Sequence, residues 1–118
     1  MRNYVLAAVD DMFFAAKIRG TAEQIGLEVS FTKTVEAALE RAREDSPRLI
    51  IADLHSTKLD PFALAVALKA DESLRRIPLI GFFSHVQTEL QLRAEQTGFD
   101  KVMPRSAFSK RLSEILQG

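Results

Sequence analysis

Residues 49–53 have the sequence LIIAD, in which four apolar residues stop at an aspartate. A short, continuous apolar run predicts a strand that is buried on both faces, as in a parallel sheet. Residues 4–9 and 79–83 are further short apolar runs, and the first of them stops at Asp10 and Asp11. We therefore expect a parallel sheet with residues 49–52 as its central strand.

Segments with the spacing of helices alternate with these strands. Apolar residues recur at intervals of three and four in residues 12–25, 35–42, 62–68, 86–94 and 108–116. Two further short strands are predicted at residues 27–32 and 99–103. Strands that alternate with helices predict parallel crossover units, with helices on both faces of one sheet. The expected fold class is α/β.

Residues with capping preferences predict where the helices begin and end. The expected N-caps are Thr34, Asp60 with Pro61 behind it, Ser84 and Ser106. Gly26 and Gly98 are expected to end their helices in the left-handed conformation, and Pro47 is expected to end the second helix.

Length and composition limit the function classes. The 118 residues fit one domain, and the 16 basic residues balance the 16 acidic ones, which argues against binding to nucleic acid or to a membrane. The absence of cysteine excludes disulfides and thiolate chemistry. A signal peptide and a long apolar span are also absent from the sequence, so a cytoplasmic location is expected.

Carboxylates follow two of the predicted strands. The carboxyl ends of parallel strands lie at one edge of the sheet, so Asp10, Asp11 and Asp53 are expected to meet there. Carboxylates that lie close together repel one another, and a hard divalent cation such as Mg²⁺ relieves this repulsion. The backbone carbonyl of His55 could complete the ligand set.

These motifs, in order along the whole chain, resemble the receiver domains of bacterial response regulators. The matching stretches are Val9-Asp10-Asp11, residues 49–54, Asp60, residues 77–80 and residues 98–102. The resemblance implies a flavodoxin-like (βα)5 three-layer sandwich with a five-stranded parallel sheet. It also implies an atypical stand-alone receiver in a phosphorelay, rather than an enzyme.

The resemblance assigns roles to the carboxylates. Asp53 would accept a phosphoryl group, and Asp10 and Asp11 would hold Mg²⁺ directly or through water. The implied partners are a histidine kinase or phosphotransfer protein and a downstream effector protein. The fourth helix and fifth strand could form a partner surface, and the sequence leaves open whether the chain forms a homodimer.

Some positions depart from the family pattern. Phe83 stands where the family has Ser or Thr, and its ring cannot donate a hydrogen bond to a phosphoryl oxygen. Ser84, the next residue, could substitute for that hydroxyl. Arg105 replaces the family lysine and keeps the charge with a different shape. Val102 replaces the aromatic switch residue.

Alternatives follow from these departures. The pair Asp10 and Asp11 could be only a helix N-cap, and Phe83 could be ordinary core packing. The domain would then be a phosphorylation-independent pseudo-receiver that acts as a protein-interaction module. A small enzyme that uses Asp53 as a nucleophile on a diffusible substrate is a third reading, although the chain leaves no room for a lid.

Overall fold

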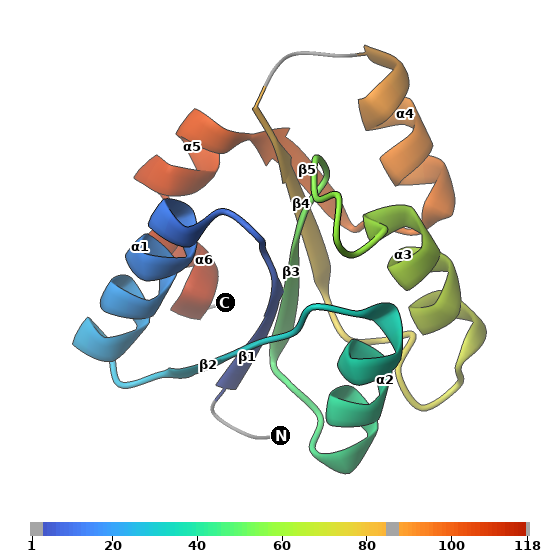
Figure 1. Ribbon diagram of the computed structural model, residues 1–118, viewed down its shortest axis with the longest axis horizontal. Coiled ribbons are helices and arrows are strands. Elements are labelled where there is room, and N and C mark those ends of the chain that lie inside the picture. The colour runs from blue at the N-terminus through green and yellow to red at the C-terminus, as the bar shows by residue number, and fades with distance from the viewer. Residues whose placement is uncertain (1–3, 85–87, 118) are drawn as a thin grey trace.

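The computed structural model describes residues 4–84 and 88–117 of the chain. In this part of the chain, five parallel strands form one sheet in the order β2-β1-β3-β4-β5. The strands are β1 (Tyr4–Ala8), β2 (Glu28–Phe31), β3 (Leu49–Asp53), β4 (Leu79–Phe83) and β5 (Lys101–Pro104). The predicted parallel sheet, with β3 at its centre, is confirmed (Figure 1).

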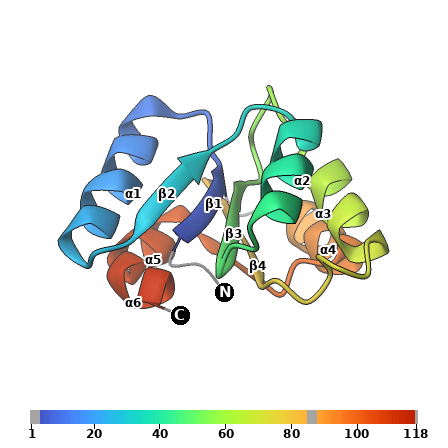
Figure 2. The ribbon, with the colours of Figure 1, turned by 90° about the horizontal axis from the view of Figure 1, so that it is seen from below.

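Helices cover both faces of the sheet, as Figure 2 shows. One layer contains α1 (Met12–Gln24), α5 (Arg105–Lys110) and α6 (Leu112–Gln117). The opposite layer contains α2 (Val35–Glu44), α3 (Pro61–Ala70) and α4 (Thr88–Thr97). The expected α/β three-layer architecture is therefore confirmed.

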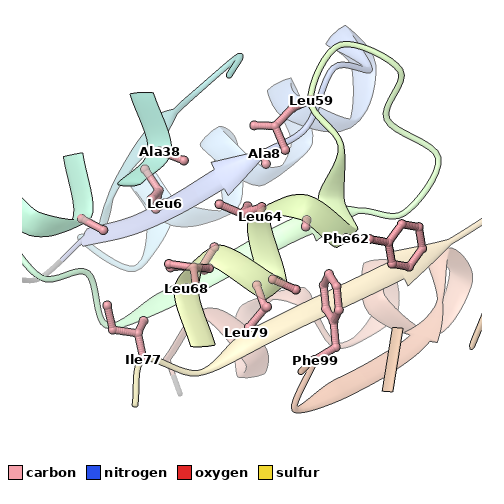
Figure 3. Close-up of a cluster of buried hydrophobic side chains, with 14 of the residues drawn as sticks. Leu6, Ala8, Ala38, Leu59, Phe62, Leu64, Leu68, Ile77, Leu79 and Phe99 are labelled. Atoms are coloured by element: carbon pink, nitrogen blue, oxygen red, sulfur yellow. The ribbon is translucent and has the colours of Figure 1, made fainter. Parts of the chain in front are cut away.

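The core is divided between the two faces by the alternation of side chains along the strands. In β1, Val5 and Ala7 pack toward α1 and α6, whereas Leu6 and Ala8 pack toward α2 and α3. Figure 3 shows the second of these hydrophobic clusters, to which β1 contributes Leu6 and α2 and α3 contribute Ala38 and Leu64. Strands buried on both faces explain why their sequences are apolar without interruption.

Most of the predicted helix boundaries are confirmed. The Thr34 hydroxyl accepts a hydrogen bond from the Ala37 N–H at 3.0 Å, and the Asp60 carboxylate caps α3, which has Pro61 at its start. Gly26 and Gly98 have φ angles of 75° and 115°, the left-handed region expected after a helix. The second helix ends at Glu44, ahead of Pro47.

The expected start of the last helix was wrong. Helix α5 begins at Arg105, its N-cap is Pro104 without a side-chain hydrogen bond, and Ser106 lies inside the helix. The strand runs directly into the helix through the fixed φ of Pro104, so no loop residue is left for a serine cap. The single predicted helix is also divided, because Arg111 ends α5 with ψ 15° before α6 begins.

The predicted N-cap of the fourth helix at Ser84 stays a prediction, because residues 85–87 lie outside the described part of the chain. Helix α4 begins at Thr88. Ser84 lies in a bend after β4, and the predicted helical segment that begins with Val86 lies partly outside the described residues. Across those residues, no helix combines the length and apolar character needed to cross a bilayer.

Candidate functional site

The carboxyl ends of β1 and β3 lie next to each other at the point where the strand order reverses. The two strands pair in parallel, with Ala8 opposite Ala52. Asp10 and Asp11 follow β1, and Asp53 is the last residue of β3. Ligands of open α/β sheets bind outside the strand ends at such a switch point. All three carboxylates therefore lie at the edge of the sheet where the sequence predicted a site.

Asp53 is the buried member of this group. Its residue surface is only 7% exposed, and its Oδ1 accepts a hydrogen bond from the His55 N–H at 2.9 Å. Burial raises the pKa of the Asp53 carboxyl above its ordinary value, and the nearby Asp10 carboxylate adds to this effect. The His55 N–H and the charge of Arg105 act in the opposite direction but do not outweigh the burial.

Because burial raises the pKa of the Asp53 carboxyl in the folded protein, its negative charge is expected to destabilise the fold at neutral pH. The unfolded chain loses this proton near pH 3.8 and the folded chain only at higher pH, so stability falls as pH rises through that interval. We expect Asp53→Asn to melt at a higher temperature than the wild type at pH 7. The difference should shrink as the pH falls below about 4. Thermal unfolding followed by circular dichroism across this pH range measures it.

Asp71→Asn is the matched control, because hydrogen bonds from Ser73 and from Arg43 hold the pKa of the Asp71 carboxyl below its ordinary value. A group of this kind adds stability at neutral pH, and this stability is lost on acidification. Asp71→Asn should therefore melt at a lower temperature than the wild type at pH 7. A difference for Asp53→Asn that does not change with pH would contradict the proposed cause.

Asp10 is held by the loop of residues 56–58. Its Oδ2 accepts hydrogen bonds from the Ser56 hydroxyl at 2.7 Å and from the N–H groups of Thr57 and Lys58, each at 3.2 Å. Burial acts to raise the pKa of Asp10, but these hydrogen bonds outweigh it and hold the pKa below its ordinary value. The loop after β3 therefore stabilises Asp10 as a carboxylate.

Asp11 is held by two kinds of donor. Its Oδ1 caps α1 by accepting hydrogen bonds from the Phe13 and Phe14 N–H groups at 2.9 and 3.1 Å. Its Oδ2 lies 2.8 Å from Nη2 of Arg105 in an ion pair. The Arg105 hydrogen bond is the main reason why the pKa of Asp11 lies below its ordinary value. Asp11 is therefore the N-cap of α1 and also binds Arg105.

Asp10 and Asp11 bind donor groups of the protein itself in this structure. Within residues 4–84 and 88–117, no three His, Asp or Glu side chains form a group that could hold a metal ion. Asp10 and Asp11 have carboxylate oxygens, the kind of ligand that Mg²⁺ prefers. In this structure these carboxylates accept hydrogen bonds from Ser56 and Arg105. The predicted magnesium site, with Asp10, Asp11, Asp53 and the His55 carbonyl as ligands, stays a prediction.

Phe83 belongs to the core. Its residue surface is 1% exposed, and it packs in the cluster with Leu6, Leu59 and Leu64. Phe82, the residue that pairs with Asp53 in the sheet register, packs on the opposite face. The alternative that Phe83 is ordinary core packing is therefore confirmed.

The other predicted site residues differ in their surroundings. Ser84 is exposed in the bend that follows β4. Val102 lies in β5 and packs, partly buried, against the same cluster as Phe83. Arg105 lies at the acidic edge, where it pairs with Asp11.

Sequence reasoning missed the contacts that organise this edge. Ser56 and Phe14 were not predicted as site residues, yet Ser56 binds Asp10 and the Phe14 ring lies 4.3 Å from the Arg105 guanidinium carbon. The only sequence signal for Ser56 was its place in the loop after β3. Phe14 was predicted correctly as an apolar residue of the first helix, and its second contact could not be read from periodicity.

Known proteins resemble this chain in sequence and in fold. No family model matches the chain. Over 117 residues the chain is 26% identical to the polar-differentiation response regulator DivK of Brucella ovis, an alignment that covers 99% of this chain and 95% of DivK. A response regulator from Hahella chejuensis has a TM-score of 0.86 at 19% identity, with 98% of this chain and 93% of that chain covered.

A further solved structure is the Mn²⁺-bound form of the response regulator Rcp1. Its TM-score is 0.78 at 19% identity, and the match covers 99% of this chain and 91% of that chain. These structural neighbours agree in fold, and the sequence match to DivK extends over nearly the whole chain. The chain therefore has the flavodoxin-like fold of the CheY-like receiver domains and is similar in sequence to a response regulator.

Proposed function

We propose that this chain is a receiver domain of two-component signalling and that Asp53 accepts the phosphoryl group. The observation that carries the proposal is the position of Asp53, a carboxylate at the end of the central strand, 7% exposed, at the switch point of the sheet. The likeness to DivK over 95% of that protein supports the same class of function. The domain would work in the cytoplasm as a phosphorylated signalling protein, not as an enzyme.

The proposed transfer is a substitution at phosphorus. An oxygen of the Asp53 carboxylate forms a bond to phosphorus, while the bond from phosphorus to the donor's imidazole nitrogen breaks. The donor imidazole carries a proton on its other ring nitrogen, so it leaves with the electron pair of that bond as a neutral imidazole. Arg105 supplies positive charge near Asp53, and positive charge stabilises the charge that develops on a transferring phosphoryl group. A histidine kinase or phosphotransfer protein would be the donor, and an effector protein would receive the signal.

The proposed function includes binding of Mg²⁺ by carboxylates, which are ligands that this ion prefers. Asp10, Asp11 and Asp53 are the predicted ligands, and the Mn²⁺-bound form of Rcp1 is a divalent-cation complex of a protein with the same fold. In this chain, Asp10 and Asp11 would have to exchange their present partners for the ion. We therefore expect binding of Mg²⁺ to compete with the Arg105 ion pair.

A second candidate function is a phosphorylation-independent interaction module. The burial of Phe83 in the core favours it, because this residue stands where the family has Ser or Thr and has no hydroxyl to bind a phosphoryl oxygen. The contacts of Asp10 with Ser56 and of Asp11 with Arg105 favour it as well, because they already occupy carboxylate oxygens. In this case the domain would act by docking to a partner, with Asp53 as an unmodified carboxylate.

One experiment separates the two functions. We expect intact-mass spectrometry after incubation with acetyl phosphate and magnesium chloride to detect one added phosphoryl group on the wild type and none on Asp53→Asn. Asp71→Asn is the matched control, because Asp71 follows the distal end of α3 and should leave the adduct unchanged. An unmodified wild type that is still folded would contradict the receiver function and favour the docking module.

A further inference from the structure

Arg105 contacts the start of α1 in two ways. Its Nη2 lies 2.8 Å from Oδ2 of Asp11, and its guanidinium carbon lies 4.3 Å from the centre of the Phe14 ring. A guanidinium over an aromatic face is an attractive contact, and it adds to the attraction of the ion pair. One side chain of α5 therefore contacts both a charged and an aromatic residue of α1.

The Phe14 ring is part of a buried aromatic cluster formed by Phe14, Phe82 and Phe108. The ring centres of Phe14 and Phe82 are 4.7 Å apart, and those of Phe82 and Phe108 are 4.8 Å apart. Phe14 is 5% exposed, and the other two residues are fully buried. The cluster joins α1, β4 and α5, so a shift of one ring must be accommodated by close-packed neighbours.

The cluster lies on the sheet next to Asp53. Asp53 pairs with Phe82 in the parallel register of β3 and β4, and paired residues of a sheet direct their side chains to the same face. Arg105 acts electrostatically on Asp53, as described above. Arg105 therefore links the charge at the acidic edge to the rings beneath α1 and α5.

We propose that Arg105 couples the charge on Asp53 to the packing of α1 against α5. Additional negative charge on Asp53 attracts the guanidinium away from Asp11 and off the Phe14 ring, and the aromatic cluster adjusts. The inference rests on the proposed function for the source of that charge, since an aspartyl phosphate carries about two negative charges at neutral pH and the carboxylate that it replaces carries one. The layer that contains α1, α5 and α6 would then carry the signal.

A double-mutant cycle tests this coupling without phosphorylation. The proteins are the wild type, Asp53→Asn, Arg105→Gln and the double variant, each with ¹³C-labelled phenylalanine rings observed by NMR. Phe14 and Phe108 are the reporters, because neither lies on β3 or β4. Phe62 and Phe99, which contact each other on the opposite face, are the internal reference. Arg111→Gln is the matched control, since Arg111 pairs with Glu114 at the surface.

We expect Asp53→Asn to shift the Phe14 and Phe108 signals and to leave those of Phe62 and Phe99 in place. The shift should be lost in the Arg105→Gln background and kept in the Arg111→Gln background. Equal shifts in the presence and absence of Arg105, or no shift in the wild-type background, would overturn the coupling.

Phosphorylation provides the second arm, on the same samples used for intact-mass spectrometry. An adduct on the wild type with shifted Phe14 and Phe108 signals supports the coupling, and an adduct with unmoved signals overturns it. A wild type that gains no phosphoryl group contradicts the proposed function alone, and the Asp53→Asn cycle then decides the coupling. The two failures are therefore distinguishable.

Discussion

Phe82→Ala is expected to lower the free energy of unfolding by about 3–5 kcal/mol, the usual cost of truncating a buried aromatic side chain. Phe82 is fully buried and lies between the rings of Phe14 and Phe108, at centre distances of 4.7 and 4.8 Å. Its removal takes away apolar burial and leaves a cavity that rigid strand backbones cannot close. Urea unfolding followed by circular dichroism measures the loss.

Phe13→Ala is the matched control for this substitution. Phe13 is 90% exposed at the start of α1, although it is adjacent in sequence to the buried Phe14. Its truncation should change the free energy of unfolding by no more than about 0.5 kcal/mol, as is usual for a surface site. Equal losses for the two variants would contradict the assignment of Phe82 to the core.

Gly81→Ala is expected to destabilise the fold by about 1–3 kcal/mol, the usual cost of overpacking a core. A Cβ atom at this position of β4 would lie 2.9 Å from two carbon atoms of the Phe99 ring and 3.1 Å from Leu54 Cδ2. Phe99 is buried and contacts Phe62 edge to face, so its ring has little room to move. The same urea unfolding experiment measures the effect.

Gly20→Ala is the same substitution at a site without that obstacle. Gly20 lies within α1, and an added Cβ would have no heavy atom within 4 Å. Alanine restricts the unfolded chain and suits a helix, so this variant should gain about 0.5–1 kcal/mol of stability. If both alanine variants were destabilised to the same extent, the close approach of Phe99 to Gly81 could not be the cause.

The strands could be predicted from the sequence because burial on both faces leaves an uninterrupted apolar signal. Residues 79–83 were predicted without error, and the central strand was predicted to within one residue. The cap at Thr34 was predictable for a local reason, since a hydroxyl N-cap needs only the next turn of the helix.

The start of the last helix was not predictable by the same rule. A serine hydroxyl is a good N-cap in isolation, but Pro104 already sets the backbone that leads from β5 into α5. Ser106 is therefore the second residue of a helix and not its cap. The constraint came from the preceding strand, which local capping preferences do not include.

The position of the candidate site was predictable, but its internal contacts were not. Topology alone brings Asp10, Asp11 and Asp53 to one edge of the sheet. The side-chain partners Ser56 of Asp10 and Arg105 of Asp11 lie 46 and 94 positions away, and a choice among distant donors depends on side-chain packing. The expected repulsion among the carboxylates predicted a bound cation. In the structure, Arg105 supplies a positive charge to Asp11 from within the protein.

The chemical identity of the modified residue is the measurement we would make first. The protein is incubated with acetyl phosphate and magnesium chloride, reduced with borohydride, which converts an aspartyl phosphate to homoserine, and then sequenced by tandem mass spectrometry. We expect homoserine at position 53 and unchanged aspartate at positions 10 and 11. Homoserine at another position, or none anywhere in a folded protein, would contradict Asp53 as the phosphoryl acceptor.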